Sequence, residues 1–337
     1  MTIDKSKPLV SICIPVFNGE NYLLECVNSA LQQDYSNLEI LIMDNFSTDS
    51  TQLIVSKIDD NRMRYVRNNK NIGALNNFSK CVDECLGEYF VLLPHDDLLL
   101  PGFVSEYVKR LQDKAVGLVY SSVNVINAKG ISQYTRTIHN TNQKFTSEQV
   151  IQDLFVNFMP IQMAMVRTAI LKKVGAFDSE YGLFVDIQLW LKVFFDDWEC
   201  FFLTKPYSAH RSHAEQGQAA FLQLKLDILG DHWGKKLDKE FWKENSYNIF
   251  FLRIMKFVDN ELKRKNYNSE IINLLMLKIF IRSHIRFIAL SIIRFNRVVL
   301  WQELSLFSAI IKFYGFIKVI YYYPLVFINE VKKMLIK

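Results

Sequence analysis

The chain has 337 residues, 50% of them hydrophobic, which is enough to form the core of one large domain or of a domain with an appendage. Its net charge of +5 is concentrated near the end, because residues 278–337 carry ten Lys and Arg against two Glu (+8), and the preceding residues total −3. The basic end by itself would fit nucleic acid, but no nucleic-acid motif accompanies it, so nucleic acid is not an expected partner.

The first half of the chain alternates apolar runs typical of β-strands with segments whose apolar residues recur every three or four positions, as in helices. This alternation predicts an α/β fold, a Rossmann-like and mostly parallel sheet with helices on both faces. The expected strands are Leu9–Pro15, Leu38–Met43, Met63–Val66, Tyr89–Leu93 and Gly117–Ser121, and the expected helices are Glu20–Gln33, Thr51–Ile58, Asn76–Leu86 and Gly102–Leu111.

The pattern changes after residue 124. Residues 124–149 are polar and predict loops or a short antiparallel excursion, and apolar periodicity returns over Phe155–Val174. Asp186 then opens an expected helix, which places its carboxylate beside the free amides of the first turn. From about Phe241 the chain is rich in Phe, Ile, Leu, Lys and Arg, and predicts helices. We therefore expect an α/β domain over residues 1–240 and a helical, basic and aromatic region over residues 241–337.

The five cysteines are odd in number and lack a metal-like spacing, so we expect reduced and mostly buried thiols. Reduced thiols favour a cytoplasmic location. The first eight residues are polar and charged, and the apolar run after them has only the length of a strand, so no signal peptide is expected.

Two adjacent carboxylates, Asp96 and Asp97, follow the apolar run Tyr89–Leu93. Carboxylates are costly to bury unpaired, but at a strand end they can bind a hard cation and the phosphates that it carries. Taken alone, the pair fits an exposed turn before a helix better than a cation site. Asp44 ends another expected strand, and the carboxyl ends of parallel strands meet in one crevice where ligands bind. The sequence therefore predicts a site at this edge of the sheet.

Six motifs in order resemble the inverting family 2 glycosyltransferases of the GT-A fold, over roughly residues 9–215. They are Ile14–Asn18, Glu39–Asp49, Asn71–Gly73, Asp96-Asp97 with Pro101, Val174–Asp178 followed by Asp186 and Leu189–Leu191, and Arg211–His213. Two positions depart from the family pattern. Asn45 stands where the family often has a second aspartate, and Pro94 stands where it often has an aspartate before the acidic pair.

The resemblance implies a nucleotide-diphosphate-sugar donor. The residues expected to bind it are Pro15, Phe17, Asn18, Glu20, Asp44, Asn45, Asn77, Asp96 and Arg211. It also implies a divalent metal, Mg²⁺ or Mn²⁺, held by Asp97 with His213, since such ions take few protein ligands. Other roles stay open: Asp44 as a cap or turn residue, Arg211 as one half of a salt bridge, and His213 as a surface or capping residue.

Inversion requires an acceptor hydroxyl to attack opposite the leaving group. A carboxylate within hydrogen-bond reach can take its proton, which typically contributes about 10²–10⁴-fold. The resemblance makes Asp186 the candidate catalytic base, and a stabilising carboxylate at a helix N-terminus is the alternative. Asp178 and Glu180 are nearby rivals that fit turn positions better.

The implied activity is a metal-dependent inverting transfer of a single sugar to a growing glycan in surface polysaccharide biosynthesis, such as O-antigen or capsule assembly. Single transfer is expected because the Gln-x-x-Arg-Trp element of processive synthases is missing. One rival is a catalytically weak sugar-nucleotide-binding or scaffold subunit. Another is a sugar nucleotidyltransferase, which would need a Gly-rich basic loop that residues 16–20 do not supply.

The basic region shapes the expected partners. Lys278, Arg282 and Arg286 recur every fourth residue on an otherwise apolar segment, and no stretch reaches the roughly 20 apolar residues of a spanning helix. Such helices suit a membrane interface with anionic lipid. Together with the family resemblance, these helices imply a polyprenyl-diphosphate-linked acceptor and a peripheral position at the inner face of the cell membrane. Packing on the α/β domain, or on a second subunit in a homo-oligomer, is the alternative.

Overall fold

The structure is a computed structural model that describes residues 6–146, 149, 163–175, 177–178, 185–213, 257–258, 260–261 and 264. The chain divides into two compact units, Met1–Ile151 with Pro160–Ala220 and Gln152–Met159 with Phe221–Lys337. Most of the described residues belong to the first unit. The helices expected beyond residue 264 lie outside the described residues, and they and the boundary at residue 240 stay predictions.

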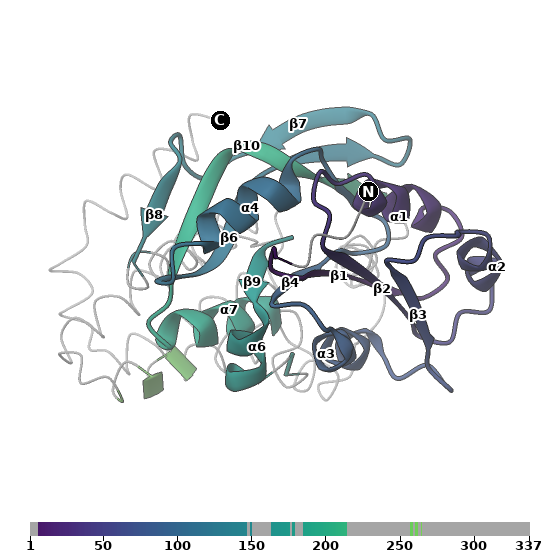
Figure 1. Cartoon of the computed structure of the whole chain (residues 1–337), viewed down its shortest axis with the longest axis horizontal. Coiled ribbons are helices and arrows are strands. Elements are labelled where there is room, and N and C mark those ends of the chain that lie inside the picture. Colours follow the sequence, from purple (N-terminus) through teal and green to yellow (C-terminus); the bar gives the residue numbers. More distant parts are fainter. Residues whose placement is uncertain are drawn as a thin grey trace, which may run out of the picture. The chain divides into compact units, whose positions relative to one another are not determined.

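The first unit is built on one ten-stranded sheet with the strand order β3-β2-β1-β4-β9-β6-β10-β5, to which β7 adds beside β6 and β8 beside β10 (Figure 1). The strands are β1 Val10–Val16, β2 Leu38–Asp44, β3 Met63–Arg67, β4 Tyr89–Leu92, β5 Leu98–Leu99, β6 Val116–Asn127, β7 Ser132–Arg136, β8 Gln143–Phe145, β9 Met165–Arg167 and β10 Glu199–Ser212. The helices are α1 Leu23–Leu31, α2 Thr51–Ser56, α3 Ala74–Glu84, α4 Phe103–Leu111, α6 Thr168–Val174 and α7 Val185–Phe195.

The predicted parallel arrangement is confirmed for β3, β2, β1 and β4, which pair in parallel. The second half of the sheet is mixed: β9 is antiparallel to β4 and β6, and β10 is parallel to β6 but antiparallel to β5. The expected antiparallel excursion after residue 124 is also confirmed, as the hairpin of β6 and β7 and as the strand β8.

Successive side chains of β1 point to opposite faces of the sheet, as strand geometry requires. Val10, Ile12 and Ile14 join the core that includes the buried residues of α1 and α4, whereas the thiol of Cys13 contacts the carbonyl of Cys81 in α3. Figure 1 shows α1 and α4 on one side of the sheet and α3, α6 and α7 on the other. Burial on both faces explains why these strands are continuous apolar runs.

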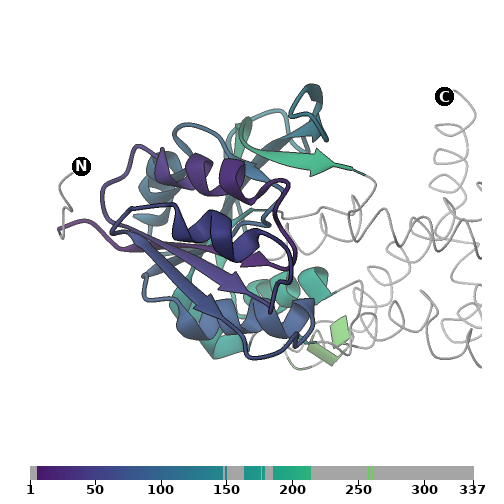
Figure 2. The same ribbon diagram turned by 90° about the vertical axis from the view of Figure 1, so that its right-hand side faces the viewer.

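Helices α1 and α2 lie side by side at the β1–β2–β3 half of the sheet (Figure 2). The loops that precede these helices join across the carboxyl ends of β1 and β2. The Gly19 amide donates to Thr51 Oγ1 at 2.9 Å and the Glu20 amide to Asp49 Oδ2 at 2.9 Å. The β1–α1 and β2–α2 loops therefore form one rim along the edge where the site was predicted.

Strand β10 was not predicted, although it carries several residues of the site. A register shift between Leu203 and Ser208, around Pro206, breaks its pairing with β6. Proline cannot donate a ladder hydrogen bond and is confined to bulges and edges, so the strand lacks a regular alternation over its length.

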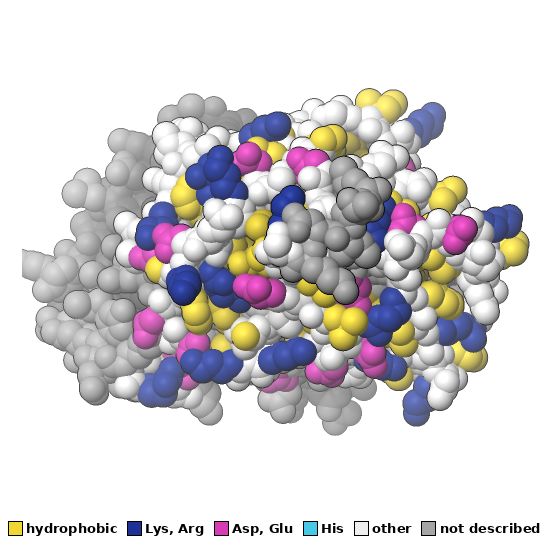
Figure 3. Space-filling model, viewed as in Figure 1, with side chains coloured by type: hydrophobic (Ala, Val, Ile, Leu, Met, Phe, Trp, Pro, Cys, Tyr) yellow, Lys and Arg dark blue, Asp and Glu magenta, His cyan; other side chains and the backbone are white. Residues whose placement is uncertain are grey.

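Among the described residues, no helix combines the length and the apolar character needed to cross a membrane. On the face shown in Figure 3, the basic and acidic side chains of the described residues are interspersed. The described part of this face therefore carries no continuous patch of one charge.

Candidate functional site

The acidic pair lies in the short connection between β4 and β5. The Asp97 amide donates to the Pro94 carbonyl at 3.0 Å, which closes a tight turn directly after β4. Asp96 is 9% exposed and Asp97 is 2% exposed. The alternative of an exposed Asp-Asp turn is therefore wrong, because both carboxylates are buried and need partners.

The carboxylate of Asp97 receives its partners from β10. The Arg211 amide donates to Asp97 Oδ1 at 2.8 Å, and His210 Nδ1 lies 3.2 Å from Oδ1 and 3.3 Å from Oδ2. Burial raises the pKa of Asp97, although the hydrogen bond and charge of His210 oppose this shift. Burial lowers the pKa of His210, but the hydrogen bond to Asp97 and its charge outweigh burial and raise it. The two groups therefore stabilise each other's charged forms.

The carboxylate of Asp96 meets a different residue of the same segment. Its Oδ2 lies 3.0 Å from His213 Nε2. Within the described part of the chain, the other ring nitrogen of His213, Nδ1, is buried without a hydrogen-bond partner. The ring of Tyr22, just before α1, lies 4.9 Å from the His213 ring. Asp96 and His213 thus form a second acid–histidine pair next to that of Asp97 and His210.

Arg211 is 1% exposed and lies between these two pairs. Its Nε donates to the Asp96 carbonyl at 2.8 Å, and its Nη2 donates to Glu25 Oε2 at 2.6 Å. Its Nη1 reaches the carbonyls of Asn127 and Ala128 at the end of β6, at 3.4 and 3.3 Å. The contact with Glu25 is the salt bridge that was the alternative role for Arg211. A contact of Arg211 with the nucleotide sugar stays a prediction.

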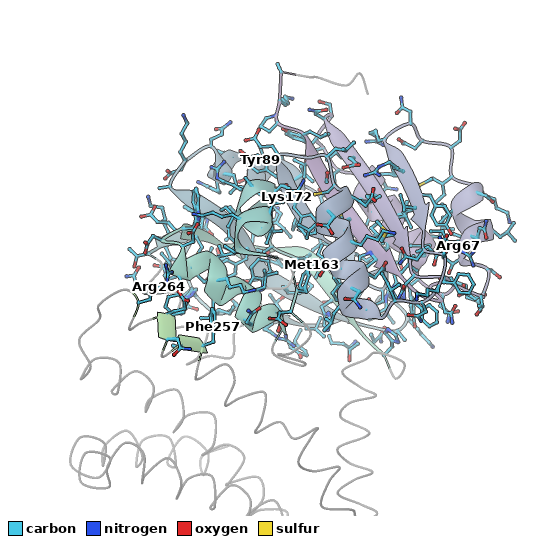
Figure 4. All side chains as sticks on the ribbon, turned by 90° about the horizontal axis from the view of Figure 1, so that it is seen from below. Arg67, Tyr89, Met163, Lys172, Phe257 and Arg264 are labelled. Carbon is cyan, nitrogen blue, oxygen red and sulfur yellow. The ribbon has the colours of Figure 1, made fainter. Side chains whose placement is uncertain are left out.

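Asp44 is fully buried at the carboxyl end of β2. Its Oδ1 accepts from the amide and hydroxyl of Ser47 at 2.8 and 2.6 Å, and its Oδ2 accepts from the Tyr65 hydroxyl at 2.5 Å. Arg67, at the β3 edge of the sheet (Figure 4), brings Nε to 3.3 Å from Asp44 Oδ2 and its guanidinium to 4.6 Å from the Phe46 ring. Asp44 therefore fixes the start of the β2–α2 loop. This is the role of a turn residue, which was the alternative to nucleotide binding.

Asn45 and Asn77 belong to a network of buried amides. Asn45 Oδ1 accepts from Asn68 Nδ2 at 3.2 Å and from the Ile72 amide at 2.9 Å. Asn68 Nδ2 also donates to Asn77 Oδ1 at 2.9 Å, and Lys80 Nζ donates to Asn68 Oδ1 at 2.7 Å. The network joins the ends of β2 and β3 to α3 and gives the rim a second rigid side.

The remaining residues predicted to bind the nucleotide sugar lie in β1 and in the β1–α1 loop. Asn18 has a positive φ of 52°, and its Oδ1 accepts from the Thr48 amide at 2.9 Å. Glu20 Oε2 accepts from the Ser50 amide at 3.1 Å. Phe17 is 44% exposed beside them, and Pro15 is buried within β1. Their contacts with a nucleotide stay predictions, but the exposed ring of Phe17 offers a surface for a flat base.

Asp186 lies in the first turn of α7, where the sequence placed it, and is partly buried. Several residues before it, 179–184, lie outside the described residues. Its role as a base stays a prediction.

Two histidines of the site were missed. His210 directly precedes the Arg211–His213 motif, and reading β10 as a strand would have placed it beside Asp97. His95 is packed against the β1–α1 loop so closely that a Cβ on Gly19 would come within 2.9 Å of its ring. Burial lowers the pKa of His95. His95 directly precedes the acidic pair in sequence, but nothing in the sequence around it indicates that its ring contacts Gly19.

The donor set suits a hard divalent cation. Asp96 and Asp97 offer carboxylate oxygens, each of which can accept more than one contact, and Nε2 of His213, 3.0 Å from Asp96 Oδ2, is the ring nitrogen that faces the same space. No preformed group of three or more metal-binding side chains occurs among the described residues. The fit therefore rests on the acidic pair, with phosphate and water oxygens completing the coordination.

The model of the family described as "Glycosyl transferase family 2" matches residues 11–175. An uncharacterized glycosyltransferase of Rickettsia prowazekii is 30% identical over 246 residues, which cover 69% of this chain and 74% of that protein. The chain belongs to glycosyl transferase family 2. A second relative, an uncharacterized glycosyltransferase of Rickettsia typhi, is 32% identical over 195 residues, but the match covers only 58% of its length and 55% of this chain.

Two further proteins are similar to this family 2 chain. WfgD of Escherichia coli, named as a UDP-Glc:alpha-D-GlcNAc-diphosphoundecaprenol beta-1,3-glucosyltransferase, is 23% identical over 66% of this chain and 86% of its own length. The crystal structure of S. aureus TarS 1–349 in complex with UDP has a TM-score of 0.56 and 17% identity, covering 88% of this chain and 91% of TarS 1–349. The structural likeness confirms the predicted GT-A fold.

Proposed function

We propose that this chain transfers a single sugar, with inversion, from a nucleotide-diphosphate sugar to a hydroxyl of a growing lipid-linked glycan. The observation that carries the proposal is the pairing of Asp96 with His213 beside the buried Asp97, at the carboxyl ends of the sheet. Family 2 membership and the UDP complex of TarS support a nucleotide-sugar donor. The diphosphoundecaprenol acceptor named for WfgD supports a polyprenyl-diphosphate-linked acceptor.

Each part of the site has a role in this reaction. The rim of the β1–α1 and β2–α2 loops, with Phe17 exposed on it, encloses the nucleotide, and the buried Asp44 and Asn45 hold that rim in place. Asp186 takes the proton of the attacking hydroxyl. The acidic pair and His213 would hold Mg²⁺ or Mn²⁺, which supplies neutralisation of the charge that develops on the departing diphosphate.

The two aspartates are unequal candidates for the cation. Asp97 is the more deeply buried, and His210 and the Arg211 amide already contact its carboxylate. Asp96 is more exposed, and its Oδ2 faces His213. The sequence favoured Asp97 as the metal ligand. The contacts support Asp96 as the principal ligand, with Asp97 orienting the turn.

The experiment is a thermal-shift titration of UDP and of several nucleotide sugars, each with and without Mn²⁺. We expect a Mn²⁺-dependent rise in Tm for the wild-type chain, since a ligand that binds only the folded state stabilises it. Asp96→Asn should abolish that rise while lowering the Tm of the free protein less than Asp97→Asn does, because Asp96 is the more exposed of the two. Asp97→Asn should lower the Tm of the free protein as well, because its carboxylate pairs with His210 in the core.

Three outcomes would contradict the proposal or its metal site. A wild-type chain that binds no nucleotide sugar under any of these conditions is not a transferase of this kind. A chain that binds a donor but turns over no donor with any lipid-linked acceptor supports the scaffold subunit instead. A Mn²⁺ effect that is equal in wild type and in Asp96→Asn would remove the acidic pair from the metal site.

A further inference from the structure

The start of α1 contacts the site, although neither family resemblance nor motif spacing assigns a role to it. The centre of the Tyr22 ring lies 4.7 Å from the guanidinium carbon of Arg211 and 4.9 Å from the centre of the His213 ring. One turn along, Glu25 Oε2 accepts from Arg211 Nη2 at 2.6 Å. Tyr22 and Glu25, on one helical turn, thus contact Arg211, and Tyr22 also contacts His213; both Arg211 and His213 touch Asp96.

Glu25 and Arg211 form an unequal pair. The side chain of Arg211 is 1% exposed, whereas that of Glu25 is 55% exposed. A buried cation is costly unless a counter-charge and hydrogen-bond acceptors satisfy it. The carbonyls of Asp96, Asn127 and Ala128 provide acceptors, and Glu25 provides a full negative charge.

The position of this guanidinium matters to the acidic pair. Its Nε holds the Asp96 carbonyl, and the backbone amide of the same residue holds the Asp97 carboxylate. The turn after β6 closes over the ion pair: a Cβ on Gly130, whose φ is +76°, would lie 3.7 Å from both Arg211 Nη1 and Glu25 Oε1. Figure 1 shows α1 beside the β6–β7 hairpin. A shift of Arg211 would therefore move the turn that carries both aspartates.

Charge balance gives Glu25 a second effect. Arg211 is a permanent cation next to two carboxylates that would bind a divalent ion in the proposed function. When Glu25 neutralises Arg211, the acidic pair keeps its negative charge for that ion. Without Glu25, the unpaired charge of Arg211 would repel the ion, because the attraction and repulsion of nearby charges are strong where water is excluded.

We propose that Tyr22 and Glu25 are positioning residues of the candidate site, which act through Arg211 and His213 to orient the acidic pair and to preserve its affinity for a divalent cation bound with a diphosphate. The cation part rests on the proposed function. The clamp itself, formed by Tyr22, Glu25 and Arg211, is a property of the free chain and is tested separately.

The first measurement follows the clamp in the full-length chain without ligand. NMR of ¹⁵N-arginine-labelled protein reports how fast the Arg211 Nε–H exchanges with water. We expect Glu25→Gln to speed this exchange about tenfold or more, because the anchoring carboxylate is lost. Glu106→Gln is the matched control: Glu106 also lies in the first turn of a helix, α4, and pairs with Arg110 at 3.8 Å. Equal protection in wild type and Glu25→Gln would overturn the clamp.

The second measurement titrates Mn²⁺ with UDP and follows free Mn²⁺ by EPR. We expect Glu25→Gln to weaken Mn²⁺ binding roughly threefold, as suits a half-exposed charge, and Glu106→Gln to leave it unchanged. The defect should shrink as salt is raised from about 50 mM to about 500 mM, because screening weakens the repulsion by Arg211. Unchanged Mn²⁺ affinity in Glu25→Gln would overturn the charge effect.

Tyr22 offers a second test that does not alter charge. Tyr22→Phe keeps the ring and should match wild type in both measurements, whereas Tyr22→Leu should speed Arg211 exchange and weaken Mn²⁺ binding. If Leu and Phe behave alike, Tyr22 has no positioning role. A wild-type chain that binds neither Mn²⁺ nor UDP would overturn the proposed function, while the exchange rates of Arg211 still decide the clamp.

Discussion

His210 Nδ1 lies 3.2 Å from Asp97 Oδ1, and the two side chains are 13% and 2% exposed. The pair joins β10, near the end of the described unit, to the turn after β4, more than a hundred residues earlier. A carboxylate this deeply buried requires such a donor, since its unpaired charge would be costly. The pairing therefore explains how the acidic turn can be buried.

Replacing His210 should destabilise the chain through Asp97. We expect His210→Ala to lower the free energy of unfolding by about 1–3 kcal/mol, because a buried acceptor loses its partner. His210→Asn keeps a donor near the position of Nδ1 and should lose less than half as much. Urea denaturation of the three proteins measures the difference. Equal losses in the Ala and Asn variants would show that packing, and not the hydrogen bond, is what His210 supplies.

Asn68 should be the critical member of the amide network. Its Nδ2 serves the side chains of Asn45 and Asn77, and its Oδ1 accepts from Lys80. We expect Asn68→Ala to cost about 2–3 kcal/mol, because several buried groups lose a partner together. Asn76→Ala, at an exposed position in α3 with one bond to the Ile72 carbonyl, should cost less than about 1 kcal/mol. Thermal and urea unfolding distinguish the two, and similar losses would refute the network.

The pair of Asp60 and Arg62 predicts a pH dependence of stability. A hydrogen bond from Arg62 is the main cause that lowers the pKa of Asp60, and the side chains are 23% and 15% exposed. Because the folded carboxyl group has the lower pKa, its contribution is present above the unfolded value of about 4 and is lost as pH falls through the folded value. The stability difference between wild type and Arg62→Met should therefore shrink below about pH 4.

Urea titrations at a series of pH values test this. Arg62 also donates to the Leu31 carbonyl at 3.1 Å, so a constant part of the difference should remain at low pH. A difference that is the same at every pH would show that Asp60 gains nothing from its partner.

Asp186→Asn should separate binding from chemistry. If Asp186 takes the proton of the acceptor, the variant should lose about 10²–10⁴-fold in kcat with little change in the KM of the donor. Asp178→Asn is the matched control, because Asp178 is the nearby rival before α7 in sequence, and it should retain most of the activity. Steady-state kinetics with the donor identified by thermal shift provide the measurement. A larger loss of kcat in Asp178→Asn than in Asp186→Asn would show that Asp178, and not Asp186, is the base.

Local patterns in the sequence determined much of the first unit. The apolar runs at residues 9–15, 38–43 and 89–93 became β1, β2 and β4, because a strand buried on both faces needs apolar side chains throughout. Asp44 and the acidic pair fell at strand ends for the same reason, since charged side chains interrupt such runs. The family could be identified because the polar motifs at these strand ends follow one another in the order typical of that family.

The partners of those residues were decided only by the tertiary structure. Nothing local indicates that Arg211 would be buried against Glu25, 186 residues away, or that Asp97 would pair with His210. These contacts depend on β10, whose pattern is broken at Pro206, and on its register beside β5 and β6. The sequence by itself determined which residues lie at the edge of the sheet, because burial acts on each segment separately. Only the folded chain decided which charges meet there, because charge pairing depends on distances between segments that are remote in sequence.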